Sequence, residues 1–387
     1  MAQPENLSTS HMKRYIQSAV IDDLQKKMVF IGGPRQVGKT TVALDILGGD
    51  EQHPAYFNWD YADDRRILLA GGLPPGQSLV VLDEIHKYKQ WRNYIKGLYD
   101  KQKSKISFLI TGSARLDYYR KGGDSLQGRY HYYRLHPLSV YELNTSPSTA
   151  DLHTLLTFGG FPEPFFSQSE RDWKRWQRER LSRVIHEDLV SLEQVKEVGQ
   201  LDLLAVLLQD RVASLLSINA LRGDLSASHE AVDRWVRILE NLYYCFRIRP
   251  LAAKKIKALK KDRKLYLWDW SLCQDPGARF ENLVASNLLK YCHFHEDTMG
   301  DAMELCFLRD NHKREVDFVV LRDGNPIFGV ECKTGTQGIS KHIAYFSKRT
   351  EIPVFYQVHM GNDDYEISEL RTRVLPFTHF AAEVLQI

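Results

Sequence analysis

The sequence lacks the features that mark several large classes of protein. Its five cysteines show no Cys-x-x-Cys spacing, so neither a disulfide framework nor a zinc site is expected, and reduced thiols of a cytoplasmic protein are predicted. No apolar run reaches the roughly 18 residues of a membrane-spanning helix. The N-terminus has no apolar core of the signal-peptide type. Neither His-Glu-x-x-His nor Gly-x-Ser-x-Gly occurs, although there are 14 histidines.

A strong net charge is also missing. The 52 Lys and Arg nearly balance the 49 Asp and Glu, which leaves a formal charge of +3. The 387 residues, of which 43% are hydrophobic, are enough for two or three domains with sizeable cores. Charge therefore becomes informative only where it is concentrated along the chain.

Residues 33–40 contain the pattern G-x-x-x-x-G-K-T. An apolar stretch precedes it at residues 28–31, and residues 42–47 follow at helical spacing, which is the strand–loop–helix context of a phosphate-binding P-loop. Lys39 is predicted to reach the β- and γ-phosphates of ATP, and Thr40 to bind Mg²⁺. The residues predicted to bind the nucleotide are Gly33, Pro34, Arg35, Gln36, Val37, Gly38, Lys39, Thr40 and Thr41.

A second motif, SLVVLDEI at residues 78–85, ends an apolar run in two carboxylates. Such a run suits a central parallel strand whose carboxyl end faces the nucleotide. Asp83 is predicted to hold Mg²⁺ and Glu84 to polarise the attacking water. Taken alone, the motif also fits a buried strand with a polar end, but its pairing with the P-loop favours the catalytic interpretation.

Strands and helices alternate through the first half of the chain. Strands are expected near residues 55–60 and 106–113, with helices at 61–70 and 91–99, which predicts a parallel sheet covered by helices. At the end of the later strand, Thr111 or Ser113 could hydrogen-bond the γ-phosphate or the attacking water. Either residue could instead cap the next helix.

Arg129 follows a glycine in the next loop. There it could supply a guanidinium to the γ-phosphate of a neighbouring subunit, which would require a homo-oligomer. The alternative is an ordinary surface arginine.

Six segments together carry a family resemblance. They are residues 33–41 (GPRQVGKTT), 81–85 (VLDEI), 109–116 (LITGSARL), 126–129 (LQGR), 137–139 (PLS) and 159–163 (GGFPE). The chain resembles, over nearly its whole length, the bacterial and archaeal AAA+-like ATPases with a C-terminal domain of unknown function (DUF4143-type) similar to PD-(D/E)xK nucleases. The resemblance implies an ATPase core, a winged helix, a nuclease-like end and a ring of about six subunits.

The middle of the chain fits a winged helix-turn-helix. Residues 171–197, a charged helix or helix pair, would close the first domain. Apolar residues recur at helical spacing in 229–242, after a shorter helix at 218–225 and a polar turn at 226–228. Residues 243–249 and 264–268 are expected to form the two wing strands.

Positive charge is concentrated in the same segment. Residues 227–264 contain 11 Lys and Arg but 4 acids, an excess of +7. This is the electrostatic pattern of a surface that binds the phosphates of duplex or branched DNA. The predicted contacts are Arg234, Arg237, Lys254, Lys255, Lys257, Lys260 and Lys261. The alternative is a winged helix used for packing, with a solvated basic loop.

The last third holds a possible nuclease site. Glu331 and Lys333 lie two apart on a predicted strand, so they share one face of it, and Asp317 lies on the partner strand across a turn at 323–325. Asp317 and Glu331 would bind Mg²⁺, with Glu281 from a helix as a further ligand, and Lys333 would orient or help to deprotonate water. The alternative is an inert scaffold in which salt bridges replace the metal.

The sequence thus predicts an α/β chain with an AAA+-type parallel-sheet domain, a winged helix-turn-helix and an α/β restriction-endonuclease-like domain. The expected limits are residues 12–197, 198–268 and 269–387. One functional interpretation is an oligomeric, ATP-hydrolysing enzyme that remodels or translocates DNA and can cut it. The other is a nucleotide-switched DNA-binding or adaptor protein with an inert nuclease-like end.

Overall fold

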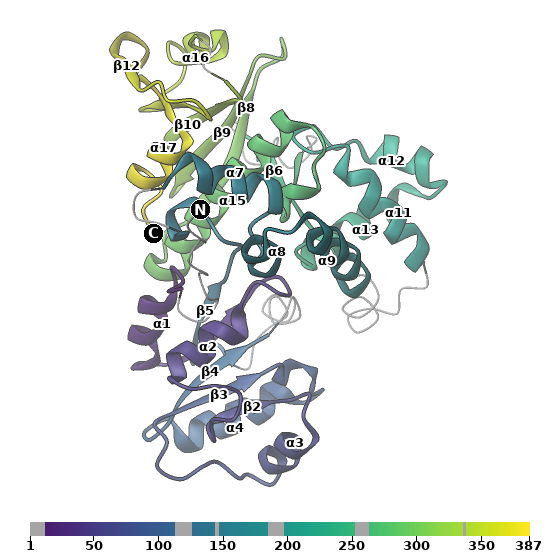
Figure 1. The fold of residues 1–387 in the computed structure, drawn as a ribbon, viewed down its shortest axis with the longest axis vertical. Coiled ribbons are helices and arrows are strands. Elements are labelled where there is room, and N and C mark those ends of the chain that lie inside the picture. Colours follow the sequence, from purple (N-terminus) through teal and green to yellow (C-terminus); the bar gives the residue numbers. More distant parts are fainter. Residues whose placement is uncertain (1–11, 113–125, 144–146, 185–196, 252–262, 336–337) are drawn as a thin grey trace, which may run out of the picture. The chain divides into compact units, whose positions relative to one another are not determined.

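The computed structural model describes residues 12–112, 126–143, 147–184, 197–251, 263–335 and 338–387 (Figure 1). The chain separates into two compact units, Met1–Pro137 and Leu138–Ile387. Within the described ranges, no helix has the length and apolar character that a membrane crossing needs.

Unit 1 is built on a five-stranded sheet in which every pairing is parallel, in the order β2-β3-β4-β1-β5. This confirms the predicted parallel sheet. Its strands are β1 (Met28–Gly32), β2 (Tyr56–Asn58), β3 (Leu79–Asp83), β4 (Ser107–Thr111) and β5 (Tyr130–Arg134). The residues of β1 are all buried, as expected for a central strand covered on both faces.

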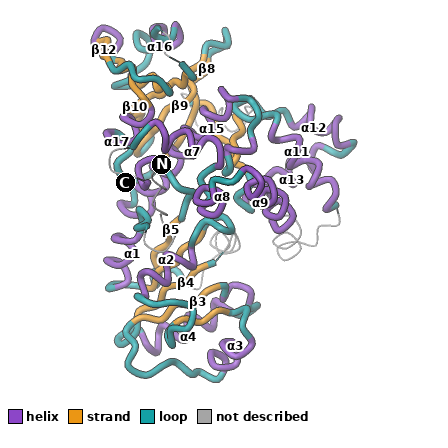
Figure 2. The backbone as a smooth tube through the Cα atoms, viewed as in Figure 1, coloured by secondary structure: helices purple, strands orange, loops and turns teal. Residues whose placement is uncertain are grey.

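Helices alternate with these strands, as Figure 2 shows. They are α1 (Gln17–Leu24), α2 (Lys39–Leu47), α3 (Ala62–Leu69) and α4 (Trp91–Gln102), with a 3₁₀ turn, η1 (Ile85–Lys87). Apolar side chains of the helices and strands, including Phe30, Trp91 and Ile110, form one buried cluster. The core therefore fixes the carboxyl ends of β1 and β3, which carry the two predicted nucleotide motifs.

Unit 2 begins with helices. They are α6 (Val140–Leu143), α7 (Thr149–Phe158), α8 (Pro162–Ser167), α9 (Glu170–Arg183), α11 (Val198–Gln209), α12 (Ile218–Leu225) and α13 (His229–Asn241). The charged helix predicted at 171–197 is described only as α9, because residues 185–196 lie outside the described ranges.

The α12–turn–α13 pattern matches the prediction closely. Ser228 begins α13 because its side chain accepts a hydrogen bond from the backbone N–H of Ala231, as an N-cap serine does. Val232, Trp235 and Leu239 of α13 are buried at the predicted helical spacing.

The C-terminal part of unit 2 is a mixed eight-stranded sheet in the order β12-β13-β11-β10-β9-β8-β6-β7. Its strands are β6 (Cys245–Pro250), β7 (Lys264–Leu267), β8 (Met303–Arg309), β9 (Glu315–Arg322), β10 (Asn325–Lys333), β11 (Phe355–His359), β12 (Tyr365–Ile367) and β13 (Thr372–Pro376). The remaining elements are α15 (Pro276–Met299), α16 (Lys341–Phe346), α17 (Phe377–Glu383), η3 (Trp270–Leu272) and η4 (Ser368–Leu370). The predicted hairpin carrying Asp317 and Glu331 is present as β9–β10.

The two strands predicted as a wing have a different place. β6 and β7 pair antiparallel, as a hairpin should, but β6 also pairs in parallel with β8 at Arg249 and Cys306. Leu265, Tyr266 and Leu267 of β7 are completely buried. Since these strands have apolar residues to bury on the C-terminal sheet, they form its edge rather than a free wing.

A buried ion pair ties α6 to α15 inside unit 2. Lys290 donates hydrogen bonds to Glu142 and, at 2.9 Å, to Ser139 Oγ, and the side chains of Lys290 and Glu142 are each 2% exposed. Two charges taken out of water need each other, because each loses its hydration.

We therefore expect Lys290→Met to lower the free energy of unfolding of unit 2 by about 3–5 kcal/mol, because Glu142 would stay buried without its ammonium. The matched control is Lys174→Met, because the Lys174 side chain is 59% exposed in its pair with Glu170, which also lies in unit 2. That change should cost less than about 1 kcal/mol. Urea denaturation followed by tryptophan fluorescence measures both, and equal small losses would contradict the expectation.

Candidate functional site

The loop between β1 and α2 depends on glycine at two positions. Gly33 has φ +139° and Gly38 has φ +97°, both in the region that side chains disfavour. A Cβ at Gly33 would also lie 2.4 Å from the carbonyl oxygen of Leu135. Gly38 starts α2, so the loop presents the N-terminus of a helix, which attracts phosphate.

Lys39 lies folded over this loop. Its ammonium donates to the carbonyl oxygens of Gly33 at 3.1 Å and Pro34 at 2.7 Å, and the residue is 7% exposed. The cation is thus held among the predicted phosphate-binding residues.

Asp83, at the end of β3, is the centre of a small polar network. Its Oδ2 accepts hydrogen bonds from Thr40 Oγ1 at 2.7 Å and from the Tyr56 hydroxyl at 2.9 Å, and its Oδ1 accepts one from Thr111. A carboxylate and a hydroxyl side by side are the hard oxygen ligands that Mg²⁺ prefers, so Thr40 and Asp83 fit the metal that accompanies ATP.

Thr111, one of the two residues predicted to contact the γ-phosphate or the attacking water, is completely buried, and its hydroxyl donates a hydrogen bond to Asp83. Its proposed contact with the phosphate or the water stays a prediction. Ser113, the other candidate on this strand end, lies outside the described residues.

Glu84 follows Asp83 in a left-handed conformation, with φ +55°. Its buried Oε2 lies 3.2 Å from Lys87 Nζ, with which it forms an ion pair, and 3.6 Å from His86 Nε2. A non-glycine residue held in this region commonly marks a functional position. Glu84 contacts Lys87, whereas Asp83 contacts Thr40, Tyr56 and Thr111, so the adjacent carboxylates can serve separate roles.

Two residues of this site were missed at the sequence level. Arg14 is buried before α1 and donates to Val37 O of the loop at 2.8 Å and to His136 O at 2.5 Å. Tyr56 holds Asp83, and burial followed by the Asp83 carboxylate raises the pKa of its hydroxyl, so it stays a donor. Neither has a local signal in the sequence, since Tyr56 is simply the first residue of β2.

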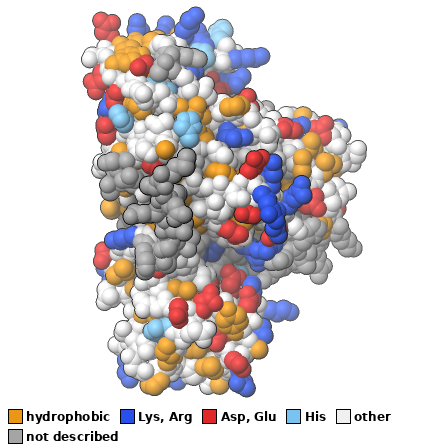
Figure 3. Space-filling model, viewed as in Figure 1, with side chains coloured by type: hydrophobic (Ala, Val, Ile, Leu, Met, Phe, Trp, Pro, Cys, Tyr) orange, Lys and Arg blue, Asp and Glu red, His pale blue; other side chains and the backbone are white. Residues whose placement is uncertain are grey.

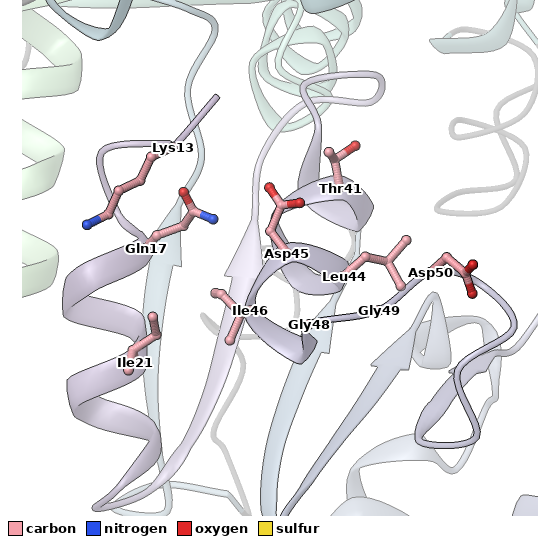
Figure 4. A pocket seen from close by; sticks show the side chains of 10 residues that line it. All are labelled: Lys13, Gln17, Ile21, Thr41, Leu44, Asp45, Ile46, Gly48, Gly49 and Asp50. Carbon is pink, nitrogen blue, oxygen red and sulfur yellow. The ribbon is translucent and has the colours of Figure 1, made fainter. Parts of the chain in front are cut away.

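A pocket of about 710 Å³ lies between α1 and α2 (Figure 4). Gln17 and Asp45 point toward one another across this pocket. Thr41, which directly follows the P-loop residue Thr40, is among the residues that line it. Its size is within the range of small-molecule sites.

Arg129 forms a two-pronged ion pair with Asp100, at 3.0 and 3.2 Å. It precedes β5, whose first residue pairs with Met28 at the start of β1. The P-loop follows the opposite end of β1, so about 16 Å of strand separates Arg129 from the loop of its own chain.

The predicted DNA-binding residues are only partly described. Arg234 and Arg237 lie on α13 with side chains 53% and 67% exposed, near Glu197 and Asp233. Lys254, Lys255, Lys257, Lys260 and Lys261 lie outside the described residues.

Other cations of the basic segment have acidic partners. Arg247 contacts Glu240, and Arg249 contacts Glu304. On the face drawn in Figure 3, Lys and Arg lie among Asp and Glu rather than in one continuous stripe.

The predicted nuclease-like residues do come together, but around a lysine. Lys264 Nζ lies 2.9 Å from Glu281, 2.7 Å from Glu315 and 3.5 Å from Asp317. The Lys264 side chain is 3% exposed. Burial lowers the pKa of its ammonium, but the carboxylates of Glu281, Asp317 and Glu315 raise it by more, so the net effect is a raised pKa. Lys264 therefore stays charged, and it is a buried residue rather than one of the solvent-exposed lysines of a wing.

Glu331 and Lys333 form the other half of the cluster. Glu331 Oε1 accepts from Lys333 at 2.7 Å and from Ser340 at 3.0 Å, whereas its buried Oε2 has no hydrogen-bond partner. Burial and then Asp317 raise the pKa of Glu331 to about 7, and the same causes raise that of Glu281 to about 7.

These contacts do not fit a divalent cation. Both oxygens of Asp317 already have partners, because Oδ2 accepts the N–H of Cys332 at 2.9 Å and Oδ1 faces Lys264. Among Asp317 and Glu331, only Oε2 of Glu331 then has no hydrogen-bond partner and could bind a metal. In the described part of the chain, the Asp, Glu and His group whose ligand atoms lie within 4.8 Å of one another is Asp364, His379 and Glu383, not the predicted set. Arg373 already bonds both carboxylates of that exposed group.

A parallel sheet with a glycine loop, a buried lysine and a threonine–aspartate pair defines a P-loop nucleotide-binding protein. Comparison with family models is more specific: residues 25–144 match an AAA domain, residues 149–275 match the domain of unknown function DUF8612, and residues 276–380 match DUF4143. The chain therefore carries an AAA-type P-loop ATPase domain followed by DUF8612 and DUF4143 domains, which confirms the family predicted from its motifs.

Its relatives include uncharacterized proteins from a bacterium and an archaeon. One from Mycobacterium tuberculosis is 24% identical over 362 residues, covering 88% of this chain and 78% of that protein. One from Methanocaldococcus jannaschii is 23% identical over 384 residues, covering 89% and 83%. A Thermotoga maritima RuvB Holliday junction branch migration motor aligns at 19% identity over 63% of this chain and 92% of that one, with a TM-score of 0.30, which is too low to establish a shared fold.

Proposed function

We propose that this chain is an ATP-hydrolysing, oligomeric protein that acts on DNA, by remodelling or translocating duplex or branched DNA. The observation that supports ATP hydrolysis is the hydrogen-bond network of Asp83. It connects Thr40 of the loop to the end of β3, where Glu84 is the next residue. Phosphoryl transfer needs positioned charge rather than covalent participation, and this network supplies it.

The roles follow from the chemistry of each side chain. Lys39 binds the β- and γ-phosphates, Thr40 and Asp83 hold Mg²⁺, and Glu84 orients the attacking water. Bound Mg²⁺ supplies positive charge that offsets the charge of the phosphates. We further propose that the pocket beside Thr41 receives the nucleoside of ATP, and that Ser113 contacts the γ-phosphate or the water.

DNA binding is proposed for the middle region, as a variant of the winged helix-turn-helix. Arg234 and Arg237 lie on the solvent side of α13, whose other face is buried. With the lysines of residues 254–261 they would contact phosphates, which positions the protein without reading sequence.

We expect that replacing Lys254, Lys255, Lys257, Lys260 and Lys261 by glutamine weakens duplex binding for all sequences alike. Fewer counterions would be released, so the slope of log affinity against log salt should fall by about 1 for each phosphate that the variant no longer binds. Fluorescence anisotropy over a salt series measures the slope.

The matched control replaces Lys101, Lys103 and Lys105, which are exposed lysines of unit 1. It should leave the slope unchanged. If both variants keep the wild-type slope, the DNA-binding surface lies elsewhere, and if neither wild type nor variant binds DNA, the DNA part of the proposal is wrong.

For the C-terminal domain we favour the scaffold interpretation over DNA cleavage. The support is Lys264, whose ammonium engages the carboxylates of Glu281 and Asp317 that a nuclease would offer to a metal. Glu331 and Lys333 then serve as an internal ion pair.

A further inference from the structure

Lys264 does not belong to the nuclease-like motif. It lies on β7, within the part of the chain that matches DUF8612, whereas Glu281, Glu315 and Asp317 lie in the part that matches DUF4143. The acidic cluster is therefore completed by a cation from the preceding domain, and the distances of 2.7 to 3.5 Å place that cation among all three carboxylates.

The backbone holds Lys264 at this position from both sides. Lys264 pairs with Ile248 of β6 and forms a bridge with Leu215, which follows α11. The flanking Leu265 donates to Ser214 O at 3.1 Å, and Leu216 donates to Arg263 O at 2.8 Å. The lysine is thus anchored by the helical region at its backbone and by the C-terminal sheet at its side chain.

The charges explain why a cation is needed. Burial and then the nearby Asp317 carboxylate raise the pKa of Glu281, so ionised Glu281 is stabilised by a neighbouring positive charge. An ammonium offers three N–H donors, and three carboxylates face this one. Arg309, 2.8 Å from Glu315, supplies a second cation at the rim.

We propose that Lys264 is an internal replacement for a divalent cation, supplied by the DUF8612 region to the acidic cluster of the DUF4143 domain. While Lys264 is in place, the cluster takes up no Mg²⁺ or Mn²⁺. Removing the ammonium, without altering any carboxylate, creates a divalent-cation site at Glu281 and Asp317. The inference concerns Lys264 and this acidic cluster, and it holds whether or not the chain hydrolyses ATP or binds DNA.

The test uses the full-length chain without nucleotide, so that the P-loop contributes no nucleotide-dependent metal site. Mn²⁺ binding is measured by the loss of the free-ion electron paramagnetic resonance signal, and melting temperature by differential scanning fluorimetry. Lys264→Ala should melt about 10 °C below wild type, since a buried ion pair is broken. Millimolar Mn²⁺ should restore much of that loss and leave the wild type unchanged.

Two further variants assign the effect. Adding Asp317→Asn to Lys264→Ala should abolish both the bound Mn²⁺ and the recovery of melting temperature. Lys290→Ala also removes a buried lysine beside a carboxylate, Glu142, but should gain no Mn²⁺ recovery, because the contacts of Lys290 are to Ser139 and Glu142 rather than to three acids.

Binding of Mn²⁺ by the wild-type chain that disappears with Asp317→Asn would overturn the proposal, and this measurement does not depend on whether Lys264→Ala folds. A folded Lys264→Ala chain that neither binds Mn²⁺ nor recovers stability would overturn the proposal as well. The position of the ammonium would then not be one that a divalent cation can occupy.

Discussion

Replacing Glu84 by glutamine should lower the rate of ATP hydrolysis by about 10²–10⁴-fold while ATP still binds, because a carboxylate that orients and polarises the attacking water is lost. Glutamine keeps the size and hydrogen-bonding reach of the side chain, so the left-handed turn at φ +55° need not change. Lys87 retains Asp60, at 2.5 Å, as a partner. The altered chain should therefore stay loaded with ATP.

The matched comparison is Lys39→Ala, which should affect binding first. Its ammonium is the positive charge over the loop, and the loss of one charged hydrogen bond weakens ATP binding by about 10- to 100-fold. Binding of radiolabelled ATP and release of phosphate separate the two variants. If Glu84→Gln hydrolyses ATP at the wild-type rate, Glu84 does not have the proposed role.

Replacing Arg129 by alanine should lower hydrolysis by about 10³-fold or more without weakening ATP binding, if a guanidinium from one subunit acts on the ATP of the next. Arg129 lies at the end of β5 that pairs with Met28, whereas the loop follows the other end of β1. It cannot reach the loop of its own chain, so any catalytic action requires a second copy, in a homo-oligomer for which we propose about six subunits.

Mixing makes this expectation specific. An assembly of Arg129→Ala and Lys39→Ala chains should regain hydrolysis, since some interfaces would combine an intact loop with an intact arginine. Asp100→Ala is the control, because it breaks the same ion pair from the other side and leaves the guanidinium free to act. Equal losses in Arg129→Ala and Asp100→Ala, or a strict monomer by light scattering with ATP and DNA present, would show that Arg129 is structural.

The elements that the sequence predicted well depend on residues close to one another in the chain. The P-loop, the strand ending at Asp83 and the α12–turn–α13 pair each follow from short-range periodicity, glycine positions or a capping serine. Glu331 and Lys333 share a strand face because side chains alternate with a period of two.

The sequence by itself determined the class of the chain, an α/β protein with an AAA-type P-loop domain and a DUF4143 domain, and it predicted a nucleotide site from one loop and one strand end. Only the tertiary structure decided which charges meet. Tyr56 reaches Asp83 from 27 residues away, Arg14 reaches His136 from 122, and Lys264 enters the acidic cluster from a strand predicted to be a wing. Periodicity shows which face of an element is buried, but a charged side chain finds its partner through the packing of distant elements, which local pattern does not encode.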